Sequence, residues 1–246
     1  MASSRTVIVV AATILSVCLL APAKEKDKGT SVDSGTFAVK KNGQVIATEN
    51  FSVQDSNNGK IISSQFKTTY GNEADVQNSE LHLSPGGDLL SYHWKEENPG
   101  KAELTLAPND QFLLEHITAN PGEKPAEQSF LMPTSTMILD NNSFVQREVL
   151  AWKYLASACK EEGGALKCSQ APAQFGVIVP QDRMSMSVSL ELVGKEKVKV
   201  NDTDRDLLRL NLKDENGIWA MWVDDQNSFK LIRIVIASEN TEVVRQ

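Results

Sequence analysis

The chain has 246 residues, a formal net charge of -7 and 41% hydrophobic residues. This length is enough for one domain with a sizeable core, and all-β domains of roughly 200 residues are common. The acidic balance and the absence of a dense block of Lys or Arg argue against nucleic acid as a partner, because a phosphate backbone is bound by clustered positive charge.

The first 23 residues are predicted to be a signal peptide. Arg5 is followed by an apolar run from Thr6 to Leu20, and Ala21–Ala23 has the small-x-small form that a signal peptidase cleaves. The run is shorter than the ~20 residues that a membrane-spanning helix needs. We therefore expect cleavage after Ala23, a periplasmic or secreted location, and a mature chain that is not an integral membrane protein.

Cys18 supports a second interpretation of the same segment. The sequence Leu15-Ser-Val-Cys18 resembles a bacterial lipoprotein cleavage box, but Val17 stands where that box has Gly, Ala or Ser. Anchoring through a lipid at Cys18 is therefore the less favoured alternative.

The remaining chain divides into a short linker and one domain. Residues 24–33 are rich in charge and predict a flexible linker, and 34–246 predict a single antiparallel β domain. The domain opens with a hairpin in which Asn42-Gly43 joins Thr36–Lys40 to Val45–Val53. An Asn-Gly pair tolerates the positive φ angles of a tight turn.

The two strands of this hairpin do not share one simple register. A two-residue turn leaves Phe37 and Val39 out of phase with Phe51 and Val53, so either both faces are partly buried or a bulge shifts the pairing. Glu49 shares the face of Phe51 and Val53, where a carboxylate is unusual. We expect Glu49 either to pair at a sheet edge or to be a polar group in a cavity.

A meander of antiparallel strands follows, beginning with 61–70. Turns at Gly86-Gly87, Glu97–Pro99 and Pro108–Asp110 then allow four strands to share one register. The predicted apolar face consists of Leu81, Leu83, Leu90, Tyr92, Trp94, Leu104, Leu106, Phe112 and Leu114. Ala119–Pro125 breaks the pattern and predicts a surface loop or a junction between two halves.

One helix is predicted, at about 142–158. Asp140–Ser143 offers Asn and Ser side chains that can accept hydrogen bonds from the first backbone N–H groups of a helix. An apolar stripe at helical spacing consists of Phe144, Val145, Val149, Trp152, Leu155 and Ala156. The helix is expected to complete the core against the sheet; the sharper alternative is that it gates a ligand cavity.

Cys159 and Cys168 follow the helix and are the cysteines left after signal cleavage. In an oxidising compartment, a disulfide across the short flexible loop between them is favoured over two free thiols. The spacing is longer than Cys-x-x-Cys, so the predicted disulfide is structural rather than redox-active.

Strands resume in the C-terminal third. Met184–Val193 alternates apolar and polar side chains, and Gly194–Lys197 predicts a turn. Four strands close the chain, at 207–213, 218–223, 229–237 and 241–245. Together these elements predict an all-β, mainly antiparallel fold, strongly curved into a half-barrel, a roll or a sandwich, with one amphipathic helix packed on the sheet.

The histidines do not predict a metal site. His82 and His93 fall on the face opposite Tyr92, whereas His116 shares the face of Phe112, so three imidazoles cannot converge on one ion. A weak site between His82 and His93 is the alternative to two solvent-facing histidines.

Other motifs that carry chemistry are incomplete or missing. Asp202–Asp206 resembles the opening of a calcium loop, but Leu207 and Lys213 stand where that loop requires Gly and Glu. The chain has no P-loop, dinucleotide fingerprint, nucleophile elbow or zinc-protease motif. We therefore predict no catalytic residue, no metal and no cofactor.

Two stretches resemble a group of exported bacterial envelope proteins that form a domain family of unknown function. They are Gly217–Asp224 with Phe229–Ile234, and the helix entry Ile138–Asn142 ahead of Phe144. The resemblance implies a spiral or half-barrel sheet that ends in this hairpin. It is also similar in outline to periplasmic lipoprotein carriers, in which a curved sheet and a helix enclose an acyl-chain cavity.

The first functional hypothesis is a non-enzymatic exported protein that binds a lipid-like or other apolar ligand between sheet and helix. Its predicted ligand-binding wall consists of Tyr92, Trp94, Phe112, Leu114, Trp152 and Leu155. The alternative is a cell-envelope scaffold or assembly partner that uses an exposed sheet edge or apolar patch and takes no small ligand. A hydrolase of envelope polymers is a distant third.

Overall fold

The computed structural model describes residues 29–69, 74–163 and 165–246. The predicted signal peptide at 1–23, the lipoprotein cysteine Cys18 and the first part of the predicted linker lie outside the described residues, as does residue 70 at the end of the predicted strand 61–70.

An N-terminal meander forms one half of the sheet, and each of its strands pairs with the next in antiparallel order. Its strands are β1 (Thr30–Lys41), β2 (Gln44–Ser56), β3 (Gly59–Thr68), β4 (Val76–Leu83), β5 (Leu89–Asn98), β6 (Glu103–Asn109), β7 (Phe112–Thr118) and β8 (Ala126–Phe130).

A C-terminal meander forms the other half. Its strands are β12 (Ala173–Val179), β13 (Met184–Val200), β14 (Thr203–Asp214), β15 (Gly217–Asp224), β16 (Lys230–Ile236) and β17 (Thr241–Arg245). The two meanders meet where β1 pairs with β17 in antiparallel fashion. The first and last described strands are therefore neighbours near the middle of one fifteen-stranded sheet.

The chain between the meanders supplies the helix. It forms β9 (Met137–Ile138), α1 (Val145–Ala158) and a separate hairpin of β10 (Cys159–Glu162) and β11 (Ala165–Cys168). Two 3-10 helices, η1 (Pro180–Asp182) and η2 (Ala237–Glu239), lie within the C-terminal meander. The pairing of β9 with β12 is parallel, whereas the other strand pairs of the described sheet are antiparallel, in agreement with the predicted mainly antiparallel fold.

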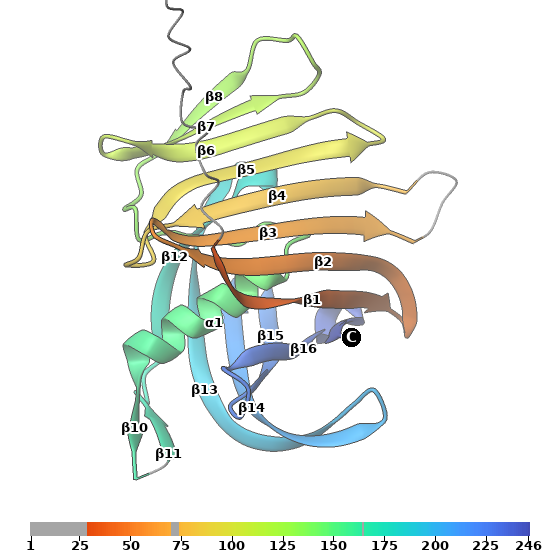
Figure 1. Ribbon diagram of the computed structural model, residues 1–246, viewed down its shortest axis with the longest axis vertical. Helices are drawn as coiled ribbons and strands as arrows, with labels where there is room; N and C mark the ends of the chain where they lie inside the picture. The colour runs from red at the N-terminus through yellow and green to blue at the C-terminus, as the bar shows by residue number, and fades with distance from the viewer. Residues whose placement is uncertain (1–28, 70–73, 164) are drawn as a thin grey trace, which may run out of the picture.

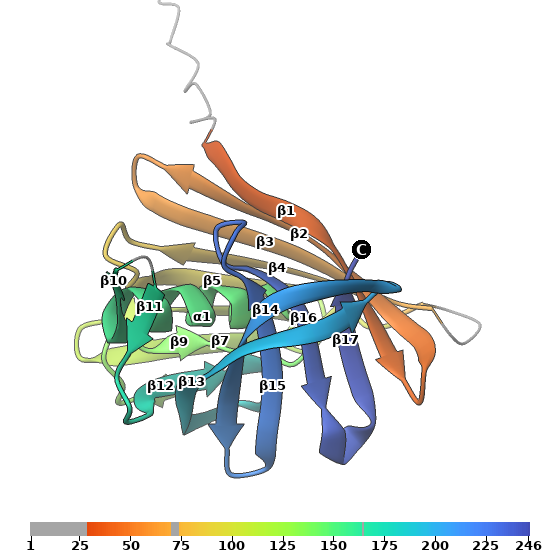
Figure 2. The ribbon, with the colours of Figure 1, turned by 90° about the horizontal axis from the view of Figure 1, so that it is seen from below.

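The sheet curves around α1. Figures 1 and 2 show the helix inside the curve, between strands of the N-terminal meander and strands of the C-terminal meander. The helix contacts β3 on one side and β16 on the other. The strand order begins at β8 and ends at β9, so the sheet stays open. The predicted fold class, a strongly curved and mainly antiparallel sheet with one helix packed on it, is confirmed.

The strand predictions of the C-terminal third are confirmed except at one turn. The four closing strands correspond to β14, β15, β16 and β17, but Gly194–Lys197 does not turn the chain. Gly194 instead has a φ of +148° at a register shift between β13 and β14, so β13 continues as one bent strand.

This bend allows a second, smaller core. The tip of the long β13–β14 hairpin packs against the face of β15–β17 that points away from α1. The buried residues of this cluster are Val198, Val200, Leu207, Trp222, Ile232 and Val244. A strand that ended at the predicted turn would leave that face of the sheet uncovered.

The register predicted for the N-terminal meander is wrong for β7. Asn109 pairs with Phe112 across a two-residue turn, so Leu113 and Glu115 face the core and Phe112 is 45% exposed. Leu114 lies half-buried on the outer side, together with His116. A shift of one residue moves every side chain of a strand to the other face, because the side-chain period is two.

Bulges explain the other differences of register. Between β1 and β2 the pairing shifts next to Val39, which confirms the bulge left open for the first hairpin. Between β4 and β5 it shifts so that Leu83 pairs with Leu89, and Leu90, predicted on the apolar face, is exposed.

The predicted linker is too long, because β1 begins at Thr30 and Asp33 is buried in it. The predicted disulfide is confirmed, with the sulfur atoms of Cys159 and Cys168 2.03 Å apart. The intervening segment, predicted to be a flexible loop, is the paired hairpin of β10 and β11.

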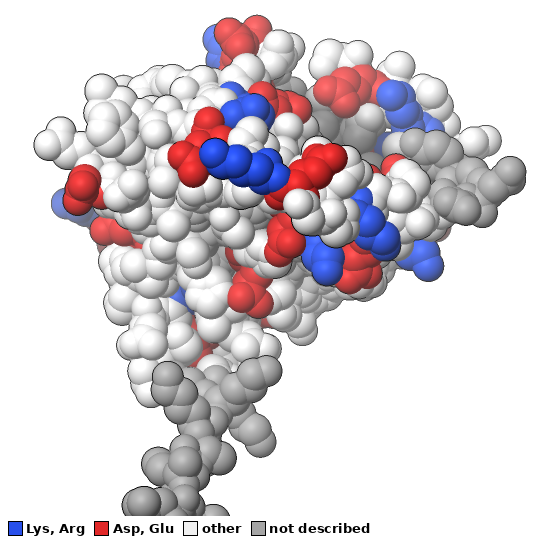
Figure 3. All heavy atoms as spheres, turned by 90° about the horizontal axis from the view of Figure 1, so that it is seen from above, with Lys and Arg blue, Asp and Glu red and all other residues white. Residues whose placement is uncertain are grey.

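None of the helices in the described part of the chain combines the length and the apolar character needed to cross a membrane. On the face shown in Figure 3, acidic and basic side chains lie next to one another rather than in large areas of one sign.

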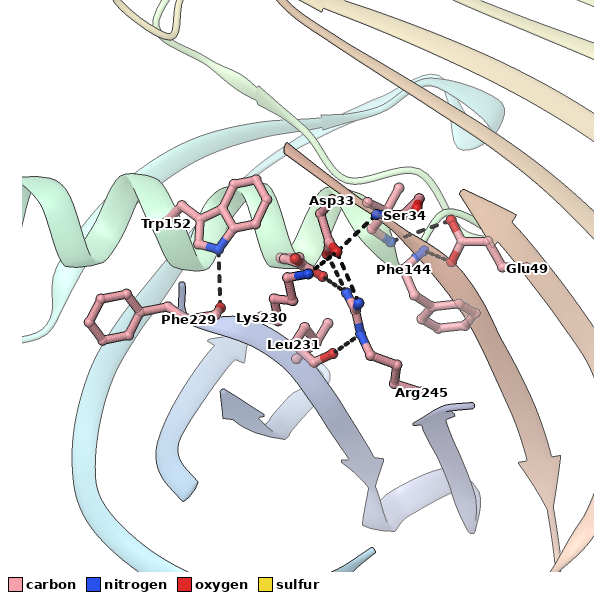
Figure 4. Close-up of polar contacts among 11 residues, drawn as sticks. Asp33, Ser34, Glu49, Phe144, Trp152, Phe229, Lys230, Leu231 and Arg245 are labelled. Atoms are coloured by element: carbon pink, nitrogen blue, oxygen red, sulfur yellow. Dashed lines mark hydrogen bonds and ion pairs between the residues drawn. The ribbon is translucent and has the colours of Figure 1, made fainter. Parts of the chain in front are cut away.

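A buried ionic cluster holds the two meanders and the helix together. Arg245 of β17 donates to Asp33 Oδ2 of β1 at 2.5 Å (Figure 4). It also donates to Glu148 Oε2 of α1 at 2.9 Å. Lys230 Nζ of β16 lies 2.9 Å from Asp33 Oδ1. Burial raises the pKa of Glu148 to about 9, so its carboxyl group is protonated and can donate to Asp33. Burial alone would raise the pKa of Asp33, but the hydrogen bonds from Arg245, from protonated Glu148 and from Lys230 hold it well below its usual range.

We predict that Arg245→Met strongly destabilises the protein, by about 3 kcal/mol in free energy of unfolding. Removal of Arg245 leaves the buried carboxyl groups of Asp33 and Glu148 with the charge of Lys230 in place of two cations. Urea unfolding of the mature chain measures this value. Lys167→Met is the matched control, since it breaks an exposed ion pair with Glu162 and should change stability little. Equal stability of the two variants would contradict the central role of Arg245.

Candidate functional site

The first half of α1 is buried on every side, its polar residues included. Gln146, Arg147 and Glu148 are each at most 4% exposed, although the amphipathic pattern placed Gln146 and Arg147 away from the sheet. Within the predicted apolar stripe, Trp152 is half-buried and Ala156 is exposed. The other stripe residues are buried: Phe144, Val145, Val149 and Leu155. The helix lies between two layers of sheet, so no face of its first turns reaches solvent.

Glu49 of β2 caps the N-terminus of α1. Its Oε2 accepts a hydrogen bond from the backbone N–H of Phe144 at 2.8 Å (Figure 4), and its Oε1 accepts one from Ser64 Oγ at 2.6 Å. The side chains of Asp140–Ser143 were predicted to cap the helix, but none forms the cap bond. A carboxylate from a distant strand satisfies the free N–H groups instead.

Glu49 was predicted either to pair at a sheet edge or to be a polar group in a cavity, and the structure excludes the sheet edge. The side chain is fully buried and does not lie at a sheet edge. Burial raises the pKa of Glu49 to about 7, and the hydrogen bonds from Ser64 and from the backbone of Phe144 partly offset this effect.

Tyr92 and Trp94 of the predicted wall are core residues near this end of α1. The Tyr92 hydroxyl donates to Asp140 Oδ2 at 2.5 Å, and Trp94 Nε1 donates to Gln77 Oε1 at 3.3 Å. The cavity beside both rings has a volume of only about 10 Å³. The space between sheet and helix is therefore filled at this end.

The other four residues of the predicted ligand-binding wall do not lie together in the structure. Phe112 and Leu114 lie on the outer side of the sheet because of the register shift in β7, so they cannot contribute to a site beside the helix. Leu155 is buried in the main core. Of the six predicted residues, only Trp152 lines a sizeable cavity.

That cavity, which we call the helix pocket, lies along the second half of α1 and has a volume of about 390 Å³. Its apolar side chains come from α1, from the end of β4 and from β9, and the turn after β4 closes one side. The lining residues are Lys60, Leu83, Ser84, Pro85, Gly86, Gly87, Met137, Val149, Trp152, Lys153, Ala156 and Ser157. The size and the apolar lining are those of a small-molecule pocket.

The walls of the helix pocket are held by backbone contacts. Trp152 Nε1 donates to the carbonyl oxygen of Phe229 at 3.1 Å, which orients the indole (Figure 4). The turn after β4 is closed by the N–H of Ser84 bonded to the carbonyl oxygen of Asp88 at 2.8 Å. Gly59 is required nearby, because its φ is +123° and a Cβ there would meet the carbonyl oxygen of Leu83 at 1.9 Å.

Sequence reasoning missed most of the pocket. Met137 lies in a two-residue strand with no pattern of its own, and the turn Ser84–Gly87 approaches α1 only in the folded chain. The helical stripe was the one available signal, since Val149, Trp152 and Ala156 all belong to it.

A larger hollow of about 500 Å³ lies over β2–β5 on the outer face of the sheet. Its lining consists mainly of Ser, Asn, Gln and charged side chains, among them His93, so it does not suit an apolar ligand.

The three histidines all lie on this outer side of the sheet, which corrects the placement of His116. Each has a glutamate within ion-pair distance: Glu80 for His82, Glu103 for His93 and Glu127 for His116. Within the described residues, no group of three or more His, Cys, Asp or Glu side chains is placed to hold a metal ion.

We predict that the free energy of unfolding falls as the pH rises from about 4.5 to about 7. The folded pKa of Glu49 lies above its ordinary value of 4.5, so the folded state keeps a proton that the unfolded state has lost, and this contribution is gone above about 7. Each pKa unit corresponds to about 1.4 kcal/mol. Urea unfolding at a series of pH values measures the slope.

Glu49→Gln removes the titration of this group but retains an acceptor for the helix N–H groups, and should reduce the slope. A slope of the same sign should remain, because burial also raises the pKa of Glu115 to about 7 and that of Glu148 to about 9. The control is Glu161→Gln, which changes an exposed glutamate of β10 and should leave the slope as in the wild type. The same slope in Glu49→Gln as in the wild type would show that Glu49 does not titrate in this range.

Comparisons of the chain with protein-family models, with curated proteins and with solved structures found no match. The resemblance to exported envelope proteins stays a prediction, and the helix pocket is interpreted from its own geometry.

Proposed function

We propose that this is an exported, non-enzymatic protein that binds a lipid-like or other apolar ligand in the helix pocket. The observation that carries the proposal is the pocket of about 390 Å³ between α1 and the β4–β5 turn, with the Trp152 indole in its wall. Burial of an apolar chain against such a lining is favourable by about 25 cal/mol per Å² of apolar surface removed from water.

Binding is favoured over catalysis by the chemistry of the lining. The described lining residues include serines and lysines but no His, Asp, Glu or Cys that could serve as a general base or thiol nucleophile. The buried carboxyl groups of Asp33, Glu49 and Glu148 hold structural contacts elsewhere.

An extracytoplasmic location, periplasmic or secreted, is part of the proposal. It is supported by the Cys159–Cys168 disulfide, which is stable in oxidising compartments, and by the predicted signal peptide at 1–23. Attachment to the membrane through Cys18 remains the less favoured form of the same proposal.

We predict that a fluorescent fatty-acid probe binds the folded mature chain saturably and that Ala156→Trp weakens this binding at least about tenfold, because an indole at this exposed pocket position fills the site. Fluorescence titration measures the Kd. Ala171→Trp adds the same group at an exposed position outside the pocket, and Phe112→Ala alters a predicted wall residue that lies outside it. Both controls should bind as the wild type does; no saturable binding by the wild type would contradict the proposal.

A second candidate function, a cell-envelope scaffold or assembly partner, is favoured by one edge of the sheet. β8 is an end strand, and Leu131, which follows it, is 74% exposed. Phe130, the last residue of β8, pairs with Leu113 of β7, and the neighbouring Phe112 is 45% exposed. An unpaired edge with apolar side chains is a surface on which another strand can add.

For this candidate we predict that Leu131→Lys abolishes co-purification of an envelope protein after cross-linking, while probe binding in the helix pocket is unchanged. A positive charge at the edge opposes strand addition. Retention of the cross-linked partner in this variant would contradict an assembly role for the β8 edge.

A further inference from the structure

Of the two lysines that line the helix pocket, Lys153 is the one without an ion-pair partner among the described residues. It lies on α1 next to Trp152, and its ammonium group is held at the wall of the pocket by two backbone carbonyl groups. Nζ donates to the carbonyl oxygen of Ser135 at 2.9 Å and to that of Gly87 at 3.3 Å. These contacts fix the position of the ammonium group beside the apolar lining.

The two carbonyl groups do not use all the hydrogen-bond donors of the ammonium group. A lysine ammonium carries three N–H donors, of which two are used here, and carbonyl dipoles do not neutralise its charge. No carboxylate of the described residues lies within ion-pair distance of Lys153; Asp88 acts on it from farther away. Burial lowers the pKa of Lys153, and the charge of Asp88 partly opposes this effect.

Lys60, the other cation of the pocket, is different. Its Nζ forms an ion pair with Asp55, so its charge already has a partner on the protein. An incoming anion would therefore bind more strongly to Lys153 than to Lys60. A charge-assisted hydrogen bond in a partly dehydrated site is stronger than one at an open surface.

We propose that the ligand of the helix pocket is an amphiphile with one acyl chain and an anionic head group, and that Lys153 binds the head group. The inference rests on the proposed function, since it names the class of ligand for the same pocket. The apolar lining takes the chain, and the free N–H of Lys153 donates to an oxygen of the carboxylate or phosphate. A volume of about 390 Å³ is at the small end of ligand pockets, which fits one chain better than two.

The test compares ligands of equal chain length: dodecanoate, dodecyl phosphate and the neutral dodecanol, each used to displace the fluorescent probe from the mature chain. We expect either or both of the anionic ligands to bind the wild type at least about tenfold more tightly than dodecanol. Lys153→Met should abolish this difference and keep the affinity for dodecanol, which also shows that the variant is folded. Lys153→Arg should retain a preference for the anion, and so should the control Lys167→Met, which removes an exposed lysine outside the helix pocket.

Three other outcomes would contradict this inference, and they distinguish its failure from failure of the proposed function. Equal affinity of the wild type for all three ligands would overturn the anionic class and leave the apolar pocket in place. An unchanged preference in Lys153→Met would overturn the role of Lys153. Failure of every ligand and of the probe to bind would overturn the proposed function and this inference with it.

Discussion

The fold depends on the burial of the first two turns of α1, polar side chains included, inside a curved sheet. A helix end without solvent must find partners for its free N–H groups, and buried charges must be paired. Glu49 of β2 meets the first need. Arg245 of β17, which bonds both Glu148 and Asp33, meets the second. Partners therefore come from both meanders, and the helix fixes their relative position.

The same constraint explains why the first and last described strands are neighbours. β1 and β17 pair along five residues, from Phe37 with Arg245 to Lys41 with Thr241. The Arg245 guanidinium also lies over the rings of Phe37 and Phe51, at 5.4 and 5.0 Å from their centroids. Cation–π contact, ion pairing and strand pairing thus reinforce one another at the seam between the two meanders.

The two halves of α1 differ in their surroundings: the first half is part of the core, and the second half lines the pocket of the proposed function. At its first turns, the space is filled by rings such as Tyr92 and by hydrogen-bonded carboxyl groups. At its second half, Ala156 and Ser157 are small and exposed, and a pocket remains between this part of the helix and the β4–β5 turn. The buried first turns fix the position of the second half of the helix, including Lys153.

Local sequence patterns predict most of the elements: period-two alternation predicts the long strands, helical spacing predicts α1, and cysteine spacing with the compartment predicts the disulfide. The faces that meet depend on contacts between distant segments. A one-residue difference at the turn before Phe112 reversed β7, and the bulge at Gly194 bent β13 where a turn was predicted. Local patterns report only on residues that are close in the sequence. The cap that Glu49 provides for a helix 95 residues away, and the pocket that both Met137 and Trp152 line, depend on contacts that exist only in the folded chain.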